Sequence, residues 1–180
     1  MIIQKEELIQ ILGHFNPWWK GQGVLDLPTW QRASFGELIR WIQNPPATRR
    51  AVFLSGARQV GKTTLLMQAI DRLIKQGVHP GNILYTTFDH PIIKLAGVDA
   101  VMEAWREREP KREGLEYVFL DEAQFIRDWG TWIKHQVDFR PDRRIIFTGS
   151  AMPITHTDQE SGFGRWHAIK LTTLSFYEYL

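Results

Sequence analysis

The chain contains no cysteine, which excludes disulfide bonds, thiol nucleophiles and thiolate metal sites. No apolar run approaches the roughly 18 residues that a membrane-spanning helix needs. The first ten residues, MIIQKEELIQ, carry acids where a signal peptide would carry a basic region. We therefore expect a soluble cytoplasmic protein without a membrane partner, and the lack of cysteine is compatible with a reducing compartment.

Several common active-site patterns are also missing. The six histidines are dispersed without an H-x-x-x-H pairing, so a histidine-built metal site is not expected. No G-x-S-x-G motif is present, because Ser150 directly follows Gly149. The net charge of +2 is small, and basic residues alternate with acids, as in REREPKRE (106–113). This pattern favours a solvated surface over a nucleic-acid patch, so a nucleic-acid partner is possible but unsupported.

The first part of the chain predicts two helices. KEELIQILGHF (5–15) has apolar residues at helical spacing. SFGELIRWIQN (34–44) begins with a capping box, formed by Ser34 and Glu37, and stops before two prolines. We interpret residues 1–46 as a helical adaptor packed on the main domain.

From Arg50 onward, short apolar runs recur between helical stretches. The runs are AVFLS, ILYTTF, YVFL, RIIFTGS and HAIKL, and the intervening helices are expected at 62–76, 99–109 and 131–137. Runs without internal alternation are typical of a parallel sheet covered on both faces. We therefore expect a three-layer α/β domain over 47–174. In LSFYEYL, Ser175 and Glu178 form a capping box that opens a helix, so 175–180 is interpreted as the start of a truncated segment.

The segment GARQVGKT fits the phosphate-loop pattern G-x-x-x-x-G-K-[ST] and stands between a predicted strand and a predicted helix. The glycines allow consecutive N–H groups to curl around a phosphate, and the helix N-terminus adds positive charge. We expect Lys62 to reach the β- and γ-phosphates, Thr63 to ligate Mg²⁺ and Thr64 to contact the α-phosphate. The predicted nucleotide-binding residues are Gly56, Ala57, Arg58, Gln59, Val60, Gly61, Lys62, Thr63 and Thr64.

Two adjacent carboxylates end the strand in VFLDEAQF (118–125). In a phosphate-loop fold Asp121 would hold Mg²⁺, and Glu122 would deprotonate a water aimed at the γ-phosphorus. Gln124 either couples phosphate state to a partner or simply satisfies the turn, and we favour the second role.

Two further positions are candidates for catalysis. Thr148, and after it Ser150, would position the water if their strand lies between the loop strand and the strand that ends at Asp121. Arg165 follows a glycine-rich segment and is a candidate arginine finger, in cis or in trans. An ordinary role, as turn cap or surface residue, is the alternative for each.

Taken together, RRAVFLSGARQVGKTT, YVFLDEAQ, IIFTGS, ESGFGR and LSFYEYL resemble a prokaryotic family of AAA-type ATP-binding proteins, from about Asn16 onward. Its members carry this ATPase domain followed by a C-terminal domain of unknown function. The resemblance implies a P-loop NTPase (RecA/AAA-like) fold with a mostly parallel five-stranded sheet, ordered 5-1-4-3-2, and ATP with Mg²⁺ as ligands. AMPITHTDQ (151–159) departs from the Ser- and Leu-rich run usual in the family, and the second domain is absent from the sequence.

These observations predict a Mg²⁺-dependent ATPase coupled to an unknown partner or process. A helicase-like nucleic-acid motor would need two tandem domains, so the alternative that stays open is a fragment of such a motor. A small-molecule kinase has less need of paired carboxylates. A GTPase would show an N-K-x-D motif, which is absent. A nucleotide-gated switch or scaffold stays open, because an arginine supplied by self-association would leave the isolated chain nearly inert.

Overall fold

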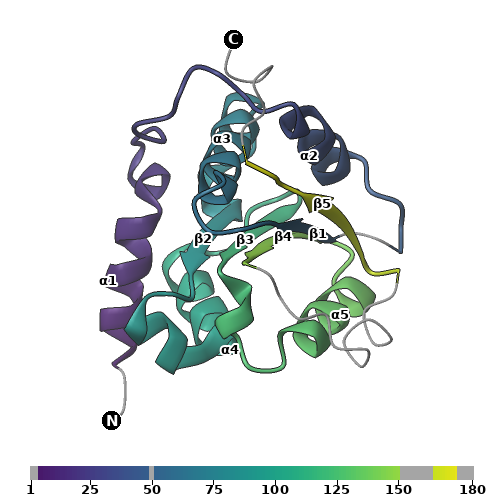
Figure 1. Cartoon of the computed structure of the whole chain (residues 1–180). Coiled ribbons are helices and arrows are strands. Elements are labelled where there is room, and N and C mark those ends of the chain that lie inside the picture. The colour runs from purple at the N-terminus through teal and green to yellow at the C-terminus, as the bar shows by residue number, and fades with distance from the viewer. Residues whose placement is uncertain (1–3, 49–50, 151–163, 174–180) are drawn as a thin grey trace.

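Five strands form one sheet with helices on both faces (Figure 1). This architecture comes from a computed structural model, which describes residues 4–48, 51–150 and 164–173. The strands are β1 (Ala51–Ser55), β2 (Ile83–Thr87), β3 (Glu116–Asp121), β4 (Arg143–Gly149) and β5 (Trp166–Lys170). The helices are α1 (Lys5–Phe15), α2 (Ser34–Gln43), α3 (Lys62–Lys75), α4 (Pro91–Arg108) and α5 (Trp129–Phe139). Short 3₁₀ turns are η1 (Pro17–Lys20), η2 (Pro80–Asn82) and η3 (Ala123–Phe125).

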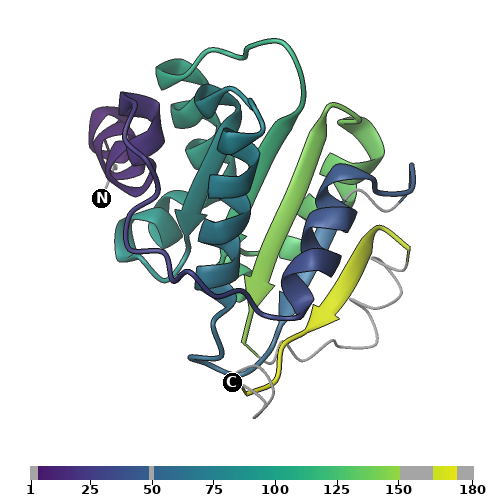
Figure 2. The same cartoon turned by 90° about the horizontal axis from the view of Figure 1, so that it is seen from above.

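The strand order is β2-β3-β4-β1-β5, which is the expected order 5-1-4-3-2 counted from the other edge. All four pairings are parallel, so the sheet is wholly rather than mostly parallel. Figure 2 shows the strands running toward a common edge, where their carboxyl ends meet. Because β4 lies between β1 and β3, its polar end lies next to both the loop after β1 and the carboxylates after β3.

The sheet separates two apolar cores. On β1, Val52 and Leu54 join the core beneath α2 and α3, whereas Ala51 and Phe53 face α4 and α5 on the opposite side. All four side chains are buried, which explains why the strand runs show no polar alternation. None of the helices in the described parts of the chain has the length and apolarity needed to cross a membrane.

The N-terminal segment covers the β2 edge of the sheet. Helix α1 packs on α4 and β2, and Asn16 follows it in a completely buried position. The Asn16 amide donates to the Leu12 carbonyl (2.7 Å) and the Tyr85 carbonyl (2.8 Å), and its oxygen accepts from the Tyr85 N–H (2.7 Å). Both Trp18 and Trp19 donate from the indole Nε1 to the Ile83 carbonyl. An edge that would otherwise expose backbone groups is therefore hydrogen-bonded.

The expected capping box of α2 does not form. Ser34 already has a helical position, because the N-cap is Ala33 and the Phe35 N–H bonds to the carbonyl of the residue before that cap. The N-cap residue provides no side-chain hydrogen bond, and the Glu37 carboxylate instead contacts His167 Nε2 on β5 at 2.7 Å. The tertiary contact with β5 thus replaces the local one.

Helix α4 begins earlier than the expected 99–109. Pro91 stands in its first turn, where its missing N–H costs nothing, and Gly97 (φ 81°) kinks the helix in the middle. The helix expected at 131–137 extends over Trp129–Phe139, and the one expected at 62–76 ends at Lys75.

A buried ion cluster stands at the amino end of β3. Glu116 is completely buried, and Arg143 contacts its carboxylate at 2.8 and 2.6 Å. Arg106 lies 3.0 Å and Arg140 3.4 Å from the same carboxylate. Burial lowers the pKa of Arg106 to about 10, and Glu116 opposes this shift. The arginine-rich stretch 106–113, expected on the solvated surface, therefore contributes the half-buried Arg106 to this cluster.

Two expectations fall outside the described residues. The capping box of Ser175 and Glu178 lies within 174–180, and the departure from the family pattern lies within 151–163. The division into an adaptor (1–46), a core (47–174) and a truncated end (175–180) stays a prediction.

We expect Asn16→Ala to lower the free energy of unfolding by about 3 kcal/mol, because it leaves the buried N–H and carbonyl of Tyr85 without partners. Urea denaturation followed by circular dichroism measures the change. Gln10→Ala removes an exposed amide from α1 and serves as the control, with an expected change within about 0.5 kcal/mol. Equal stability of the two variants would contradict the role of Asn16.

Candidate functional site

The loop between β1 and α3 has a backbone that glycine makes possible. A Cβ on Gly56 would lie 2.5 Å from the Leu171 carbonyl oxygen, so only glycine fits beside the end of β5. Gly61 has φ of 92° and Gln59 has φ of 63°, both in the left-handed region. Such a succession of turns directs backbone N–H groups toward one point, which is the arrangement that binds phosphate. The loop leads directly into the first turn of α3, whose N-terminus carries partial positive charge.

Lys62 places a positive charge against this loop. It is the first residue of α3, and only 5% of its surface is exposed. Its ammonium donates to the carbonyls of Gly56 (2.9 Å) and Ala57 (2.8 Å). The charge is therefore held where the loop turns, within reach of an anion on the loop.

Asp121, at the end of β3, is the most enclosed carboxylate of the site. It is 3% exposed and accepts hydrogen bonds from three hydroxyls. Thr63 on α3 donates at 2.7 Å and Tyr85 on β2 at 3.0 Å, both to Oδ2, and Thr148 on β4 donates to Oδ1. The Thr63 hydroxyl and the Asp121 carboxylate are hard oxygen donors of the kind that Mg²⁺ prefers, so this pair fits the metal expected from the sequence.

Tyr85 was not among the residues predicted from the sequence. It is buried, and burial together with the negative charge of Asp121 raises the pKa of its phenol above the usual value. The phenol therefore keeps its proton and acts as a donor to Asp121. The sequence offers no signal for this role, because an apolar strand commonly carries a tyrosine.

Glu122 follows in a left-handed backbone conformation, with φ of 53°. Its N–H donates to Thr148 Oγ1 at 2.9 Å, which fixes the turn against β4. Gln124 Nε2 and Ser150 Oγ both contact Glu122 Oε2, and Gln124 Nε2 also donates to Ser150 Oγ at 3.2 Å. A non-glycine residue held in this conformation is costly and typical of functional sites. Gln124, for which an ordinary turn role was favoured, thus contacts the carboxylate itself.

Arg165 is not brought to this cluster. It directly precedes β5, whose Trp166 pairs with Ala51 at the beginning of β1, so it lies at the amino edge of the sheet. The length of β1, about 16 Å, separates that edge from the loop. Its Nε lies 3.2 Å from Asp138 Oδ1 on α5. Arg58, one of the predicted nucleotide-binding residues, is exposed on the loop.

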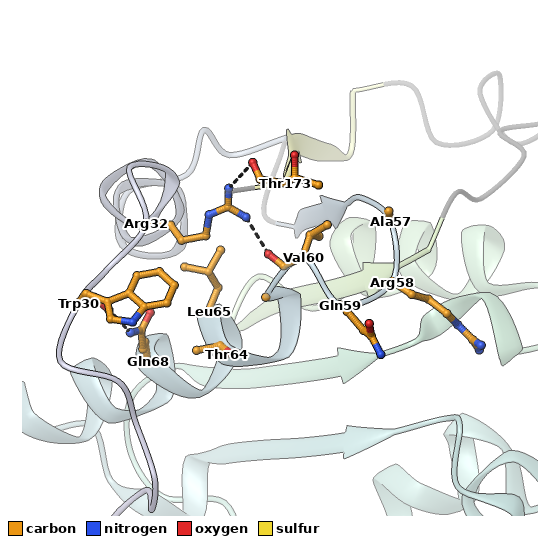
Figure 3. Close-up of a pocket in the computed structure, with 11 residues that line it drawn as sticks. Trp30, Arg32, Ala57, Arg58, Gln59, Val60, Thr64, Leu65, Gln68 and Thr173 are labelled. Atoms are coloured by element: carbon orange, nitrogen blue, oxygen red, sulfur yellow. Dashed lines mark hydrogen bonds between the residues drawn. The ribbon is translucent and has the colours of Figure 1, made fainter. Parts of the chain in front are cut away.

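A pocket of about 520 Å³ opens beside the loop, on the side of α3 that faces the N-terminal segment (Figure 3). Its lining residues come from that segment, the loop, α3 and the end of β5, and they are Trp30, Arg32, Ala57, Arg58, Gln59, Val60, Gly61, Thr64, Leu65, Gln68 and Thr173. Trp30, Arg32 and Gln68 were missed by sequence reasoning, since no motif marks them.

Two polar side chains give this pocket its shape. Arg32, 6% exposed, donates to the carbonyls of Val60 (2.7 Å), Thr172 (2.9 Å) and Thr173 (3.4 Å), and thus ties the loop to the end of β5. Gln68 donates from Nε2 to the Trp30 carbonyl at 2.9 Å and more weakly to the Pro28 carbonyl. Figure 3 shows the Trp30 indole next to Gln68 and Leu65.

The geometry agrees with comparisons to known proteins. Solved structures of similar fold include the Aeropyrum pernix Orc1 protein in complex with DNA, with 15% identity and a TM-score of 0.57, covering 85% of this chain and 47% of that one. AMPPCP-bound DnaA from Aquifex aeolicus matches with 14% identity and a TM-score of 0.52, covering 83% and 49%. At these identities the likeness shows the fold alone.

An uncharacterized protein of Haemophilus influenzae is 33% identical over 132 residues, which are 71% of this chain and 32% of that protein. The chain therefore spans about a third of this relative and less than half of the two structures. A family model described as an AAA domain matches residues 48–180. On this match and on a sheet of the same P-loop type, the chain belongs to the AAA domain family.

Proposed function

We propose that this chain is a Mg²⁺-dependent ATP-binding domain that hydrolyses ATP to ADP and phosphate. The observation that carries the proposal is the 2.7 Å hydrogen bond between Thr63 and Asp121, which joins the loop after β1 to the carboxylate after β3. A loop that only turned the chain would have no need of a buried acid at its helix N-terminus. The neighbouring Glu122 supplies a second carboxylate for proton transfer.

The phosphates of ATP lie along the loop in this proposal. Backbone N–H groups of the loop and the N-terminus of α3 bind the phosphate oxygens, and Lys62 exchanges its carbonyl partners for the β- and γ-phosphates. Thr63 and Asp121 hold Mg²⁺, which when bound neutralises charge on the phosphates. Thr64 lines the pocket beyond the loop, and in this proposal its hydroxyl contacts the α-phosphate.

The base occupies the pocket between the N-terminal segment and α3. Its volume of about 520 Å³ suits a nucleoside, and its wall combines the Trp30 ring, the Leu65 side chain and a few polar groups. Because the Gln68 amide nitrogen is bonded to backbone carbonyls, the amide oxygen is left as an acceptor. An acceptor suits the 6-amino group of adenine better than the 6-oxo group of guanine.

Hydrolysis follows from the arrangement around Glu122. A water attacks the γ-phosphorus, the bond from that phosphorus to the bridging oxygen breaks, and Glu122 takes the proton of the water. Thr148 fixes the backbone of Glu122, while Gln124 and Ser150 restrict its carboxylate. These three side chains are positioning residues for the water and its base.

If Arg165 is the arginine that stabilises the transition state, it must act on the site of a different chain. The residue lies at the far edge of its own sheet beside Asp138, so we propose that it acts toward a neighbouring chain. A specific activity that rises with protein concentration supports this arrangement, and a constant specific activity contradicts it.

Nucleic-acid binding has no support from the arginines of this chain. The Orc1 structure is described as a complex with DNA. Here, however, Arg106, Arg140 and Arg143 surround the carboxylate of Glu116.

We expect Lys62→Ala to weaken ATP binding by about a hundredfold or more, because a buried positive charge next to the phosphates is lost. Isothermal titration calorimetry with Mg-ATP measures the affinity. Lys75→Ala, at the exposed end of the same helix, is the matched control and should bind like the wild type. Tight Mg-ATP binding by Lys62→Ala would overturn the assignment of the loop.

Glu122→Gln is expected to retain Mg-ATP binding within about twofold and to lose turnover by about a hundredfold or more, because an amide cannot accept the proton of the water. Phosphate release under saturating ATP measures turnover. Glu113→Gln, the same change at an exposed position, is the control. Unchanged turnover in Glu122→Gln would remove this residue from the base role. If the wild type binds ATP but shows no turnover at any protein concentration, the result would favour a nucleotide-gated switch or scaffold over an ATPase.

For the base pocket, we expect Trp30→Ala to raise the Kd for ATP about tenfold through lost stacking. Phe139→Ala, which removes an exposed aromatic ring at the end of α5, should leave the Kd unchanged. Competition with a fluorescent ATP analogue gives both values. Equal affinity of Trp30→Ala and the wild type would place the base outside this pocket.

A further inference from the structure

Tyr85 lies outside the phosphate loop and outside the carboxylate pair, yet its phenol contacts the carboxylate assigned to Mg²⁺. We propose that Tyr85 is a positioning residue for metal binding, held in place by Asn16 of the N-terminal segment. The proposal rests on the proposed function, since it concerns how the same site orients its metal ligand. It adds two residues that no sequence motif contains.

The Tyr85 hydroxyl helps to orient the Asp121 carboxylate. The Tyr85 hydroxyl donates to Oδ2 at 3.0 Å, the same oxygen that accepts from Thr63 at 2.7 Å, and Thr148 donates to Oδ1. Donors on both oxygens fix the plane of the carboxylate as well as its position. Without the phenol, Oδ2 keeps only Thr63, whose hydroxyl oxygen is itself the other metal ligand. Tyr85 is therefore the donor to Oδ2 whose position is independent of the metal.

The second step is the way in which Tyr85 is held. It belongs to β2, an edge strand of the sheet, where none of the described strands pairs with the outer side of the backbone. Asn16 replaces that partner, because its side-chain amide bonds both the N–H and the carbonyl of Tyr85, at 2.7 and 2.8 Å. The third bond of the same amide, to the Leu12 carbonyl, fixes it to the end of α1. A continuous series of hydrogen bonds thus runs from α1 through Asn16 and Tyr85 to Asp121.

This series crosses the boundary of the family match. The AAA domain match begins at residue 48, whereas Asn16 lies in the segment before it. The N-terminal segment therefore does more than cover the sheet edge, because it sets the backbone of a residue that touches the site. Loss of a group that orients a metal ligand typically costs ten- to a hundredfold in metal affinity.

The test compares Tyr85→Phe with Tyr117→Phe. Both tyrosines are buried and belong to the same apolar core, but Tyr117 precedes Asp121 by four residues on β3, about 13 Å along the strand. The measurement is the Kd of a fluorescent ATP analogue as Mg²⁺ is titrated, and again in excess EDTA. Binding is read directly, so the outcome does not depend on turnover.

For Tyr85→Phe we expect the Mg²⁺ concentration that gives half of the Mg²⁺-dependent gain in affinity to rise about tenfold. Its Kd in EDTA and its thermal unfolding midpoint in EDTA should stay near those of Tyr117→Phe. A shift in unfolding with an unchanged Mg²⁺ response would mean that Tyr85 only packs, and would overturn the proposal. If the wild type itself shows no Mg²⁺-dependent binding, the proposed function fails before the role of Tyr85 is reached.

Asn16→Ala tests separately whether Asn16 holds Tyr85 in position. This variant retains the Tyr85 phenol but removes the hydrogen bonds to the Tyr85 backbone. Measured well below its unfolding temperature, this variant should show a Mg²⁺ response shifted in the same direction as Tyr85→Phe. A wild-type Mg²⁺ response in folded Asn16→Ala would overturn the anchoring step. Gln10→Ala, on the exposed face of α1, controls for changes in the N-terminal segment.

Discussion

The Asp121 carboxylate imposes the constraint on which the site depends. It is buried at the end of a central strand, where an ionised group is costly unless it is hydrogen-bonded. Hydroxyls from α3, β2 and β4 meet this need. To bring them together, β4 must lie between β1 and β3, and β2 must lie on the other side of β3, which is the order observed. The strand order of the sheet is therefore what brings the three hydroxyl donors to Asp121.

The N-terminal segment contributes to both sides of this arrangement. At the β2 edge, the Asn16 side-chain amide forms hydrogen bonds with the backbone of Tyr85, and the Tyr85 hydroxyl donates to Asp121. Further along the segment, Arg32 bonds the Val60 carbonyl of the phosphate loop and the carbonyls that follow β5, while Trp30 lines the pocket beside the loop. The segment precedes the family match, so these contacts come from residues outside the part of the chain that the family model covers.

The same structure separates the binding parts from the part that would complete hydrolysis. The phosphate loop, the pocket beside it, Asp121 and Glu122 lie together at the carboxyl edge of the sheet, whereas Arg165 lies at the amino edge with Asp138. Two other arginines, Arg106 and Arg143, are paired with the buried Glu116. The chain also spans only about a third of its Haemophilus influenzae relative. In the proposed function, a partner that supplies a missing group would therefore act from outside this site.

Local chemistry in the sequence determined the five strands, their parallel arrangement and the phosphate loop. Each of these features depends on residues adjacent in the chain: apolar runs without alternation, or two glycines and a lysine within eight positions. The strand order and the Asp121–Thr63 pair were also foreseeable, through the resemblance to a known family.

Only the tertiary structure decided the remaining contacts of the site and of the N-terminal segment. Glu37 contacts His167 on β5 instead of forming a capping box with Ser34, a contact between residues 130 positions apart. Tyr85, Asn16, Arg32 and Trp30 act through contacts between segments tens of residues apart, and single-sequence patterns carry no record of such contacts. Spacing along the chain fixes what a turn or strand can do, but which side chains meet at its end depends on how the strands are ordered.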